Sequence, residues 1–422
     1  MVVERRTPIQ IGEGVKRVLT YTIHKSSEQL AVENTTNRVL AEDLVADHDV
    51  PPFDRSPYDG FAIRAEDTGE ASQHNPVFLK VVEEIGAGEV AASTVKQGQA
   101  IRIMTGAAIP KGADSVAMFE VVKEHEQNSE PMIEVARRFT KGQNISYRGE
   151  DTTEGTTLLK KGTLITPGVI ALLATFGYAQ VSVYQKPRIG IFATGTELLD
   201  ISEPLQPGKI RNSNAYMIAA QVKEMGGEPV YFGKLKDDFD ACFEAISTAI
   251  GKVDALITTG GVSVGDYDYL PAIYEKLGAK VLFNKIAMRP GSVTTISEYD
   301  GKLLFGLSGN PSACFVGGEL FIRPFIKQSL GSTPFLSKTK AVLQSNFPKA
   351  NPFTRLVRSK VQFKPTGIFV KPTGLDKSSS VTSIAEANAF IVLPGGTRGF
   401  EEGAEVDVLL FESESEHNPW IN

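Results

Sequence analysis

The chain has 422 residues, of which 41% are hydrophobic and 22% are charged, so it is long enough for roughly two to four globular domains. Its formal net charge of -6 argues against a nucleic-acid-binding protein, which normally needs a basic face. No apolar run is long enough to cross a bilayer, and the first residues show no hydrophobic signal core, so we expect a cytoplasmic protein without membrane or nucleic-acid partners.

The cysteines and histidines limit the kinds of metal site. The two cysteines, Cys242 and Cys314, lie in apolar helical patterns, which predicts buried free thiols. Two cysteines exclude a disulfide framework and a thiolate zinc site. The five histidines are scattered and show no metal-ligand spacing. Any metal ion should therefore be a hard cation on oxygen ligands.

The first part of the chain predicts a small β-rich domain flanked by connecting segments. A helical pattern spans Ile11–Ile23, and a loop rich in Pro, Asp and Gly over 51–60 leads into a strand. From Phe78 to about Thr140, short apolar runs alternate with turns, as in small β domains. A further helical pattern ends at Gly177 and is followed by a strand.

From Pro187 to about residue 333, short buried strands alternate with amphipathic helical stretches. This alternation predicts an α/β domain with a parallel-dominated sheet. The remaining residues show strands with a period of two, as in Val357 to Lys364, and no helical pattern. They predict a small β-barrel or sandwich.

Three unusual loops follow predicted strands of the α/β domain, at Thr194–Glu197, Thr259–Asp266 and Leu307–Pro311. In an open parallel sheet, ligands bind beyond the carboxyl ends of the strands, so all three loops should line one crevice. Glycines and hydroxyls suit a bound anion, and the third loop opens a helix, whose N-terminus also favours anions. Ordinary strand-to-helix turns are the alternative for any one loop. The binding candidates are Gly195, Thr196, Gly260, Gly261, Ser263, Ser308, Gly309, Asn310 and Pro311.

Carboxylates gather at the same predicted edge of the sheet. Glu197 follows the first strand, Asp237 and Asp238 follow the next, and Asp266 and Asp268 follow the glycine-rich loop. Carboxylates beside an anion repel it unless a cation bridges them, and magnesium commonly uses one or two carboxylates plus ligand oxygens. We predict a metal site on Glu197 with Asp266 or Asp268, whereas Asp238 or Asp268 could instead cap a helix.

Positive charge follows another strand of this domain. Lys285, Arg289 and the turn Pro290-Gly291 are candidates for binding a small oxyanion, with ordinary surface charges as the alternative. The loop at 51–60 and the stretch Arg102–Gly106 could be simple turns if taken alone.

Several segments, taken in order, resemble the molybdopterin molybdotransferase family, of the bacterial MoeA and gephyrin E-domain type. They are PPFDRSPYDGFAIR, RIMTGAAIPKGAD, ATGTEL, RNSNAYMIAAQVKEMGGE, TTGGVSVGDYDY and LSGNPSACF. The resemblance covers nearly the whole chain and implies four domains and a homodimer whose cleft is built from both subunits. The expected domains are an elongated connector formed by 1–47 and 147–184, a small β-rich domain at 48–146, a molybdopterin-binding-type α/β domain at 185–333 and a β-barrel at 334–422.

The resemblance implies insertion of molybdate into adenylyl-molybdopterin, with release of AMP and a magnesium-type ion. The catalytic candidates that match family positions are Asp59, Thr105, Glu197, Asp237 and Asp268. Lys285 and Arg289 match a basic pair near the oxyanion, and Ser383 with Arg355 or Arg358 lies near C-terminal family positions. The chain departs from the family where Ser292 replaces the second lysine of a Lys-Pro-Gly-Lys-Pro segment and where Ser308 replaces a proline.

Two other functions remain for comparison. A molybdopterin adenylyltransferase shares the α/β domain type, but the large N-terminal region and the C-terminal β segment argue against it. A non-catalytic scaffold is the other possibility, and the presence of Asp59, Glu197 and Asp268 argues for catalysis. Other proteins of molybdenum-cofactor assembly are the expected partners.

Overall fold

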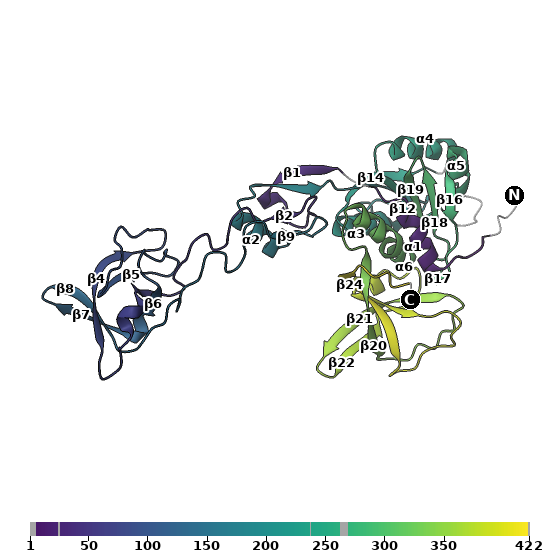
Figure 1. Ribbon diagram of the computed structural model, residues 1–422. Helices are drawn as coiled ribbons and strands as arrows, with labels where there is room; N and C mark the ends of the chain where they lie inside the picture. Colours follow the sequence, from purple (N-terminus) through teal and green to yellow (C-terminus); the bar gives the residue numbers. More distant parts are fainter. Residues whose placement is uncertain (1–5, 24–25, 237, 262–268, 421–422) are drawn as a thin grey trace. The chain divides into compact units, whose positions relative to one another are not determined.

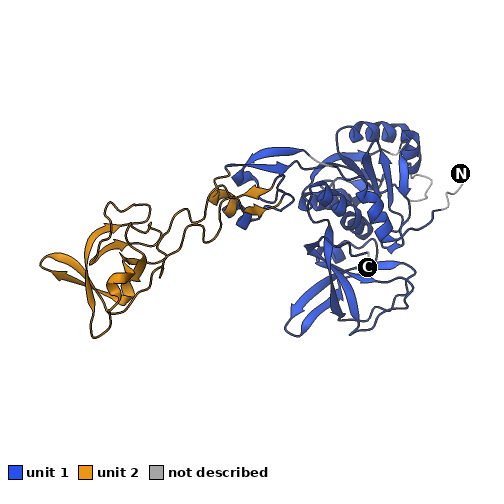
Figure 2. Cartoon of the chain, viewed as in Figure 1, with its two compact units in different colours: residues 1–42, 161–171, 179–422 blue, residues 43–160, 172–178 orange. Residues whose placement is uncertain are grey.

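The computed structural model describes residues 6–23, 26–236, 238–261 and 269–420 (Figure 1). The chain forms two compact units, coloured separately in Figure 2. Unit 1 contains residues 1–42, 161–171 and 179–422, and unit 2 contains residues 43–160 and 172–178. Four predicted site residues lie outside the described residues: Asp237, Ser263, Asp266 and Asp268. No helix among the described residues is long and apolar enough to cross a membrane.

Unit 2 is built on a six-stranded sheet with the order β6-β3-β5-β4-β8-β7. Its strands are β3 (Gly60–Ile63), β4 (Val77–Ile85), β5 (Gln99–Ile103), β6 (Ser115–Met118), β7 (Val122–Gln127) and β8 (Glu130–Val135). Phe61 and Ile63 belong to one apolar cluster and Ala62 to another, so both faces of β3 are buried. This sheet lies inside the region that the sequence predicts to be β-rich. The 3-10 turns are η2 (Ala65–Thr68) and η3 (Phe119–Val121).

Short elements flank this sheet in the chain. In unit 2, β2 (Leu44–Val45) pairs with β9 (Thr157–Leu159); in unit 1, β1 (Ser27–Ala31) precedes the 3-10 turn η1 (Val32–Asn34) and pairs with β10 (Gln180–Tyr184). Helix α2 (Pro167–Thr175) begins with proline, whose fixed φ suits a first helical turn. It stops before Gly177, whose φ of 72° is a left-handed conformation that glycine adopts readily. The predicted helix, its end and the strand that follows are therefore all present.

The α/β part of unit 1 contains a six-stranded sheet with the order β14-β11-β15-β19-β18-β16. Its strands are β11 (Arg188–Thr194), β14 (Glu228–Leu235), β15 (Ala255–Thr259), β16 (Lys280–Phe283), β18 (Thr295–Tyr299) and β19 (Lys302–Leu307). The first four strands of that order run parallel, as predicted, and β18 runs antiparallel to both of its neighbours, β19 and β16. A tight turn at Asp300-Gly301, both with positive φ, joins β18 to β19 and explains the reversal.

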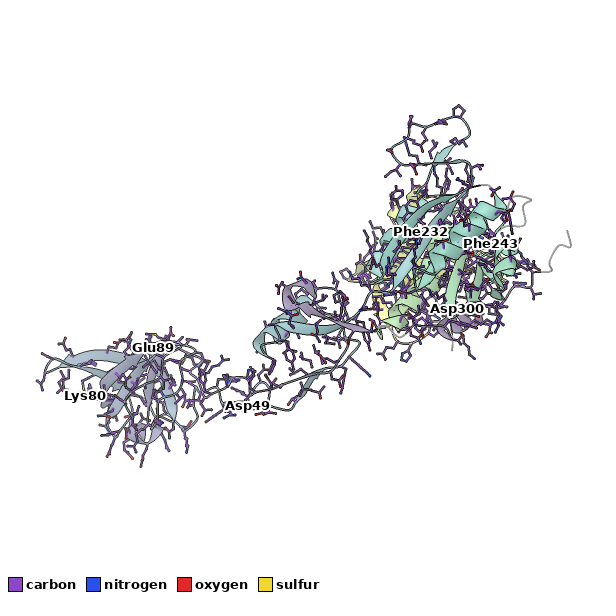
Figure 3. The ribbon with its side chains drawn as sticks, turned by 90° about the horizontal axis from the view of Figure 1, so that it is seen from above. Asp49, Lys80, Glu89, Phe232, Phe243 and Asp300 are labelled. Atoms are coloured by element: carbon purple, nitrogen blue, oxygen red, sulfur yellow. The ribbon has the colours of Figure 1, made fainter. Side chains whose placement is uncertain are left out.

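Helices cover both faces of this sheet (Figure 1). They are α1 (Ile11–Leu19), α3 (Asn214–Glu224), α4 (Phe239–Ile250), α5 (Leu270–Leu277), α6 (Pro311–Gly317) and α7 (Arg323–Ser329), with the π-helical turn η4 (Gly318–Ile322) between the last two. Ile191 belongs to an apolar cluster that contains residues of α1, α3, α6 and α7. The next residue, Phe192, belongs to a second cluster, which contains residues of α4 and α5. Phe232 and Phe243, labelled in Figure 3, are partly buried and pack against this second cluster.

The C-terminal part of unit 1 is mainly β structure. Its strands are β20 (Phe335–Leu343), β21 (Thr354–Lys364), β22 (Gly367–Pro372), β23 (Ala389–Leu393) and β24 (Glu405–Ser415). The pairings run β21-β22-β20-β24-β23 and return to β21. The sequence predicts no helix here, which is wrong for one short segment, because α8 (Thr382–Ala385) forms between β22 and β23. Strand β17 (Met288–Arg289), from the α/β part, pairs with β21.

Candidate active site

The carboxyl ends of the parallel strands surround a cleft of about 820 Å³ in unit 1. The loops after β11, β15 and β19 all contribute to its wall, as the strand directions predict. The predicted residues that line it are Gly195, Thr196, Glu197, Gly260, Gly261, Ser308, Gly309 and Asn310. Pro311 is the first residue of α6. The structure therefore brings the described members of the three loops together.

Close backbone approach explains the glycines in these loops. A Cβ atom on Gly260 would lie 2.4 Å from the Thr194 hydroxyl oxygen, so no side chain fits there without displacing β11's last residue. The Gly260 N–H donates to the Leu307 carbonyl at 2.8 Å. A Cβ atom on Gly309 would lie 3.7 Å from the Gly260 Cα. These contacts hold the second and third loops against each other at the floor of the cleft.

Glu197 is the only carboxylate among the described residues that line the cleft. Its side chain folds over Gly195, where a Cβ atom would lie 2.3 and 2.6 Å from the two carboxylate oxygens. The backbone of Glu197 is anchored because its carbonyl accepts the Ile210 N–H at 2.9 Å. The short strands β12 (Leu198–Leu199) and β13 (Ile210–Arg211) pair directly after it. Glu197 is therefore an exposed carboxylate on a fixed backbone.

No group of three or more His, Cys, Asp or Glu side chains that could hold a metal exists among the described residues. Glu197 supplies one hard oxygen ligand facing the cleft, which fits a magnesium ion that takes its other ligands from phosphate oxygens and water. Asp238 is not among the residues that line the cleft, and it caps α4 by accepting the Ala241 N–H at 2.8 Å. Of the two roles considered for Asp238, capping is the one observed.

Both cysteines are buried and outside any disulfide, as predicted. Cys314 lies in the core, where burial raises the pKa of its thiol. Cys242 lies on α4 and lines the cleft, and its thiol donates to the Lys236 carbonyl at 2.8 Å.

A second cavity of about 270 Å³ adjoins the cleft. The two cavities share Val293, Ser308 and Asn310 in their walls. The smaller one is lined by three arginines and one aspartate, namely Arg289, Arg355, Arg358 and Asp376. Its positive charge suits a small oxyanion. Lys285, which the sequence groups with Arg289, lines neither cavity.

The arginines of this cavity differ in their remaining hydrogen-bonding capacity. Arg355 contacts one oxygen of Asp376 through Nε at 2.9 Å and Nη2 at 2.8 Å. Arg289 is exposed and forms no salt bridge within the described part of the chain. The guanidinium of Arg289 and the Nη1 group of Arg355 are therefore available to a bound anion.

Arg358 is 1% exposed, and protein acceptors occupy its guanidinium. Its Nη1 lies 3.3 Å from Asp376, and its Nη2 donates to the Leu375 and Lys377 carbonyls. Its Nε donates to the buried Ser383 hydroxyl at 3.3 Å. Burial lowers the pKa of Arg358, although the Asp376 carboxylate opposes this shift. Arg358 and Ser383 thus hold the loop that borders the smaller cavity.

Asp59 and Thr105 contact each other in unit 2. One oxygen of Asp59 accepts the Thr105 backbone N–H at 2.7 Å and the Thr105 hydroxyl at 2.8 Å. These hydrogen bonds, the backbone one first, lower the pKa of Asp59. Both side chains are exposed, so the pair presents an ionised carboxylate to its surroundings.

Sequence reasoning missed three residues around these cavities. Asp376 and Ser378 line the smaller cavity but lie in a loop without a recognisable pattern. Asn214 donates to the Gly309 carbonyl at 2.7 Å. Asn214 belongs to the segment RNSNAY, which the sequence comparison with the family had already singled out, and its place at the start of a predicted helix could have indicated this role.

Comparison with known proteins gives matches along the chain. Residues 9–177 match the family described as MoeA N-terminal region (domain I and II), and residues 340–411 match the MoeA C-terminal region (domain IV). Residues 190–328 match the family described as probable molybdopterin binding domain.

Proteins similar over the whole chain are also known. The chain is 58% identical over 421 residues to a molybdopterin molybdenumtransferase of Bacillus subtilis (strain 168), covering 99% of this chain and 98% of that protein. It is 50% identical over 416 residues to one of Staphylococcus aureus (strain MSSA476), covering 98% of each. A crystal structure of the molybdopterin biosynthesis moeA protein from Pyrococcus horikoshii OT3 superposes with a TM-score of 0.81 at 32% identity, covering 96% of this chain and all of that one.

Proposed function

The chain belongs to the MoeA family, and from this premise we propose that it acts as a molybdopterin molybdotransferase. The reaction inserts molybdate into adenylyl-molybdopterin, releases AMP and yields molybdenum cofactor. The observation that carries the proposal is the pair of adjoining cavities with a common wall of Val293, Ser308 and Asn310. One substrate is a large phosphate-bearing pterin and the other is a small oxyanion. The two cavities differ correspondingly, since one is large and the other is small and lined by arginines.

The larger cavity suits the pterin substrate. Its volume of about 820 Å³ lies in the upper range of ordinary ligand pockets. The backbone N–H of Gly261 and the hydroxyls of Thr196 and Ser308 can donate to phosphate oxygens. Glu197 would hold a magnesium ion together with those oxygens, and the ion would act as a Lewis acid at the phosphate joined to AMP.

The smaller cavity suits molybdate. Arg289 and Arg355 present guanidinium groups whose charge-assisted hydrogen bonds recognise tetrahedral oxyanions. We assign Arg358 and Ser383 a supporting role, because they hold the surrounding loop. Binding and orientation of the two substrates across a common wall are then the main contributions of the protein.

We propose that the active form is a homodimer with a cleft built from both subunits, as the family resemblance implies. Large exposed apolar side chains in the segment after Glu197 and on α3 and β14 support this assembly, because burial at a protein interface would remove them from water. They are Ile201, Leu205, Ile210, Tyr216 and Tyr231, each at least 40% exposed. In the same reaction, Asp59 would act as a carboxylate that Thr105 holds in place.

We also propose the four-domain arrangement predicted from the sequence, with a C-terminal β-barrel. The closed ring of pairings among β20 to β24 supports the barrel. The matched family descriptions, which name domains I, II and IV, support the division into four.

The two alternative functions explain less of the chain. An adenylyltransferase needs only the α/β part, whereas both flanking regions here match MoeA regions. A scaffold does not require the arginine cavity beside the cleft.

The deciding experiment measures AMP release from adenylyl-molybdopterin with and without molybdate and magnesium. Release that requires both supports the transferase. If the pterin binds but no AMP is released, the transferase is wrong. Supplying ATP and free molybdopterin then separates the adenylyltransferase from the scaffold.

A further inference from the structure

The segment 308–310 separates the two cavities. Ser308 and Asn310 line both of them, and Gly309 between them lines the larger one. Any rotation of the peptide that joins Gly309 to Asn310 therefore changes the surface of both cavities at once. Glycine has unusual backbone freedom, so this peptide needs an anchor to stay in one orientation.

Asn214, the first residue of α3, supplies such an anchor. It is 8% exposed, and its Nδ2 donates to the Gly309 carbonyl at 2.7 Å. Its Oδ1 is buried and has no hydrogen-bond partner among the described residues. The contact with Gly309 is thus the one side-chain hydrogen bond that the structure records for Asn214.

Asn212 fixes the position from which Asn214 acts. It is 1% exposed, its Nδ2 donates to the Tyr231 hydroxyl at 3.0 Å, and its Oδ1 accepts the Ala215 N–H at 3.2 Å. The start of α3 is therefore held to the edge strand β14 independently of Gly309.

Peptide planarity carries the effect of Asn214 to the cavity wall. In a trans peptide the C=O and the following N–H point in opposite directions. Because Asn214 holds the Gly309 carbonyl, the Asn310 N–H is turned to the opposite side, where it donates to the Ser308 hydroxyl oxygen at 3.2 Å. The Asn310 N–H and the Ser308 hydroxyl, which both belong to the common wall, then keep one orientation.

We propose that Asn214 is a positioning residue of the transferase reaction, which holds the Gly309-Asn310 peptide so that the wall between the cavities aligns the two bound substrates. The inference rests on the proposed function, and it gives Asn214 no direct contact with either substrate.

Loss of the hydrogen bond from Asn214 to Gly309 should impair the alignment of the two substrates more than the affinity for either one. Each substrate keeps most of its own cavity, so KM for either should change by no more than about three-fold. A small misplacement of reacting groups can cost about 100-fold in rate, so kcat should fall by about 10- to 100-fold.

The test compares Asn214→Ala with Gln221→Ala. Gln221 lies on the same helix, is 4% exposed, and its Nε2 donates to the Phe315 carbonyl and the Glu319 carboxylate, away from both cavities. Both variants lose a buried amide donor, so both should lower the unfolding temperature. Asn214→Leu, which keeps nearly the side-chain shape, serves as a second variant in case the alanine variant folds poorly.

The expected result is a fall in kcat per folded molecule for both Asn214 variants and wild-type kcat for Gln221→Ala. If the Asn214 variants keep kcat within two-fold of Gln221→Ala, the residue is merely structural and the inference is wrong. Wild-type protein that releases no AMP in the presence of molybdate overturns the proposed function as well, so the two failures are distinguishable.

Discussion

Arg289 of β17 and Arg355 of β21 are register partners in a parallel strand pair. The pairing places two guanidinium groups from distant parts of the chain at one cavity. Asp376 neutralises Arg355 at 2.8 Å, and no described residue forms a salt bridge with Arg289. Asp376 also contacts Arg358 at 3.3 Å, so one carboxylate serves two arginines. Arg289 is the arginine of this cavity that no described acidic side chain pairs with.

Replacing Arg289 with alanine should weaken molybdate binding. Hydrogen bonds to charged groups contribute about 1.5–3 kcal/mol, so KM for molybdate should rise by about 10- to 100-fold. Lys285→Ala is the matched control, because Lys285 lines neither cavity. Steady-state AMP release at varied molybdate concentration measures both variants. Equal effects of the two substitutions would contradict the assignment of the oxyanion to this cavity.

Glu197→Ala should abolish most turnover while leaving the fold intact. The side chain is exposed, so its loss removes little packing, and the unfolding temperature should stay within about 1 °C of wild type. A magnesium ligand contributes several kcal/mol at the transition state, so kcat should fall by about 100-fold or more.

Glu203→Ala tests whether the Glu197 effect is specific. Glu203 follows β12 and accepts the Asp200 N–H at 2.6 Å, outside the lining of the cleft. Its replacement should leave kcat and the dependence on magnesium unchanged. Wild-type rates in Glu197→Ala would remove Glu197 from the mechanism.

Thr105→Val should raise the pKa of Asp59 only part of the way to its ordinary value. The backbone N–H of Thr105 is the larger cause of the lowered pKa and remains in the variant, whereas the hydroxyl is lost. Because the pKa of Asp59 is lower in the folded chain than in the unfolded chain, its hydrogen bonds to Thr105 stabilise the fold at pH values above the unfolded-state pKa. This stabilisation disappears as the pH falls through the folded-state pKa.

Carboxyl-carbon NMR of aspartate-labelled protein measures this shift, with Asp59→Asn to assign the signal. Asp49 is the internal control, because the Glu154 N–H and then Arg148 lower its pKa without Thr105. The Asp49 titration should not move. An unchanged pKa of Asp59 in Thr105→Val would show that the hydroxyl contributes nothing.

The convergence of the glycine loops was predictable, because it follows from strand direction alone. Thr194, Thr259 and Leu307 each end a parallel strand, and such ends meet at one edge of a sheet. The chain reversal between β18 and β19 was also predictable, since Asp300-Gly301 is a typical hairpin dipeptide.

The arginine cavity was only partly predictable. Arg289 was identified beside its strand, but its register with Arg355 depends on a strand pair between distant segments. Arg358 resembled a ligand residue in sequence, yet its acceptors are loop carbonyls that no periodic pattern reveals. Lys285 and Arg289 are equivalent by charge and differ only in where the fold places them.

Glu319→Ala should destabilise unit 1 strongly. Glu319 and Arg323 have side chains that are each 3% exposed, and they form an ion pair at 2.6 Å on the segment from η4 to α7. Without Glu319, the acidic partners that remain for the buried Arg323 among the described residues are Glu224 at 3.6 Å and Glu414 at 3.5 Å. Removing one partner of a buried pair costs about 3–5 kcal/mol in the free energy of unfolding.

Glu224→Ala is the control for this ion pair. Its side chain is 62% exposed, so its contribution to stability should be at most about 1 kcal/mol. Urea unfolding followed by the fluorescence of Trp420, the only tryptophan, reports on the core cluster that also contains Leu320 and Ile322. A similar loss in both variants would show that the charge of Arg323 is compensated by its weaker partners. A much larger loss for Glu319→Ala would identify the buried pair as the interaction that secures η4 and α7, which continue directly from α6.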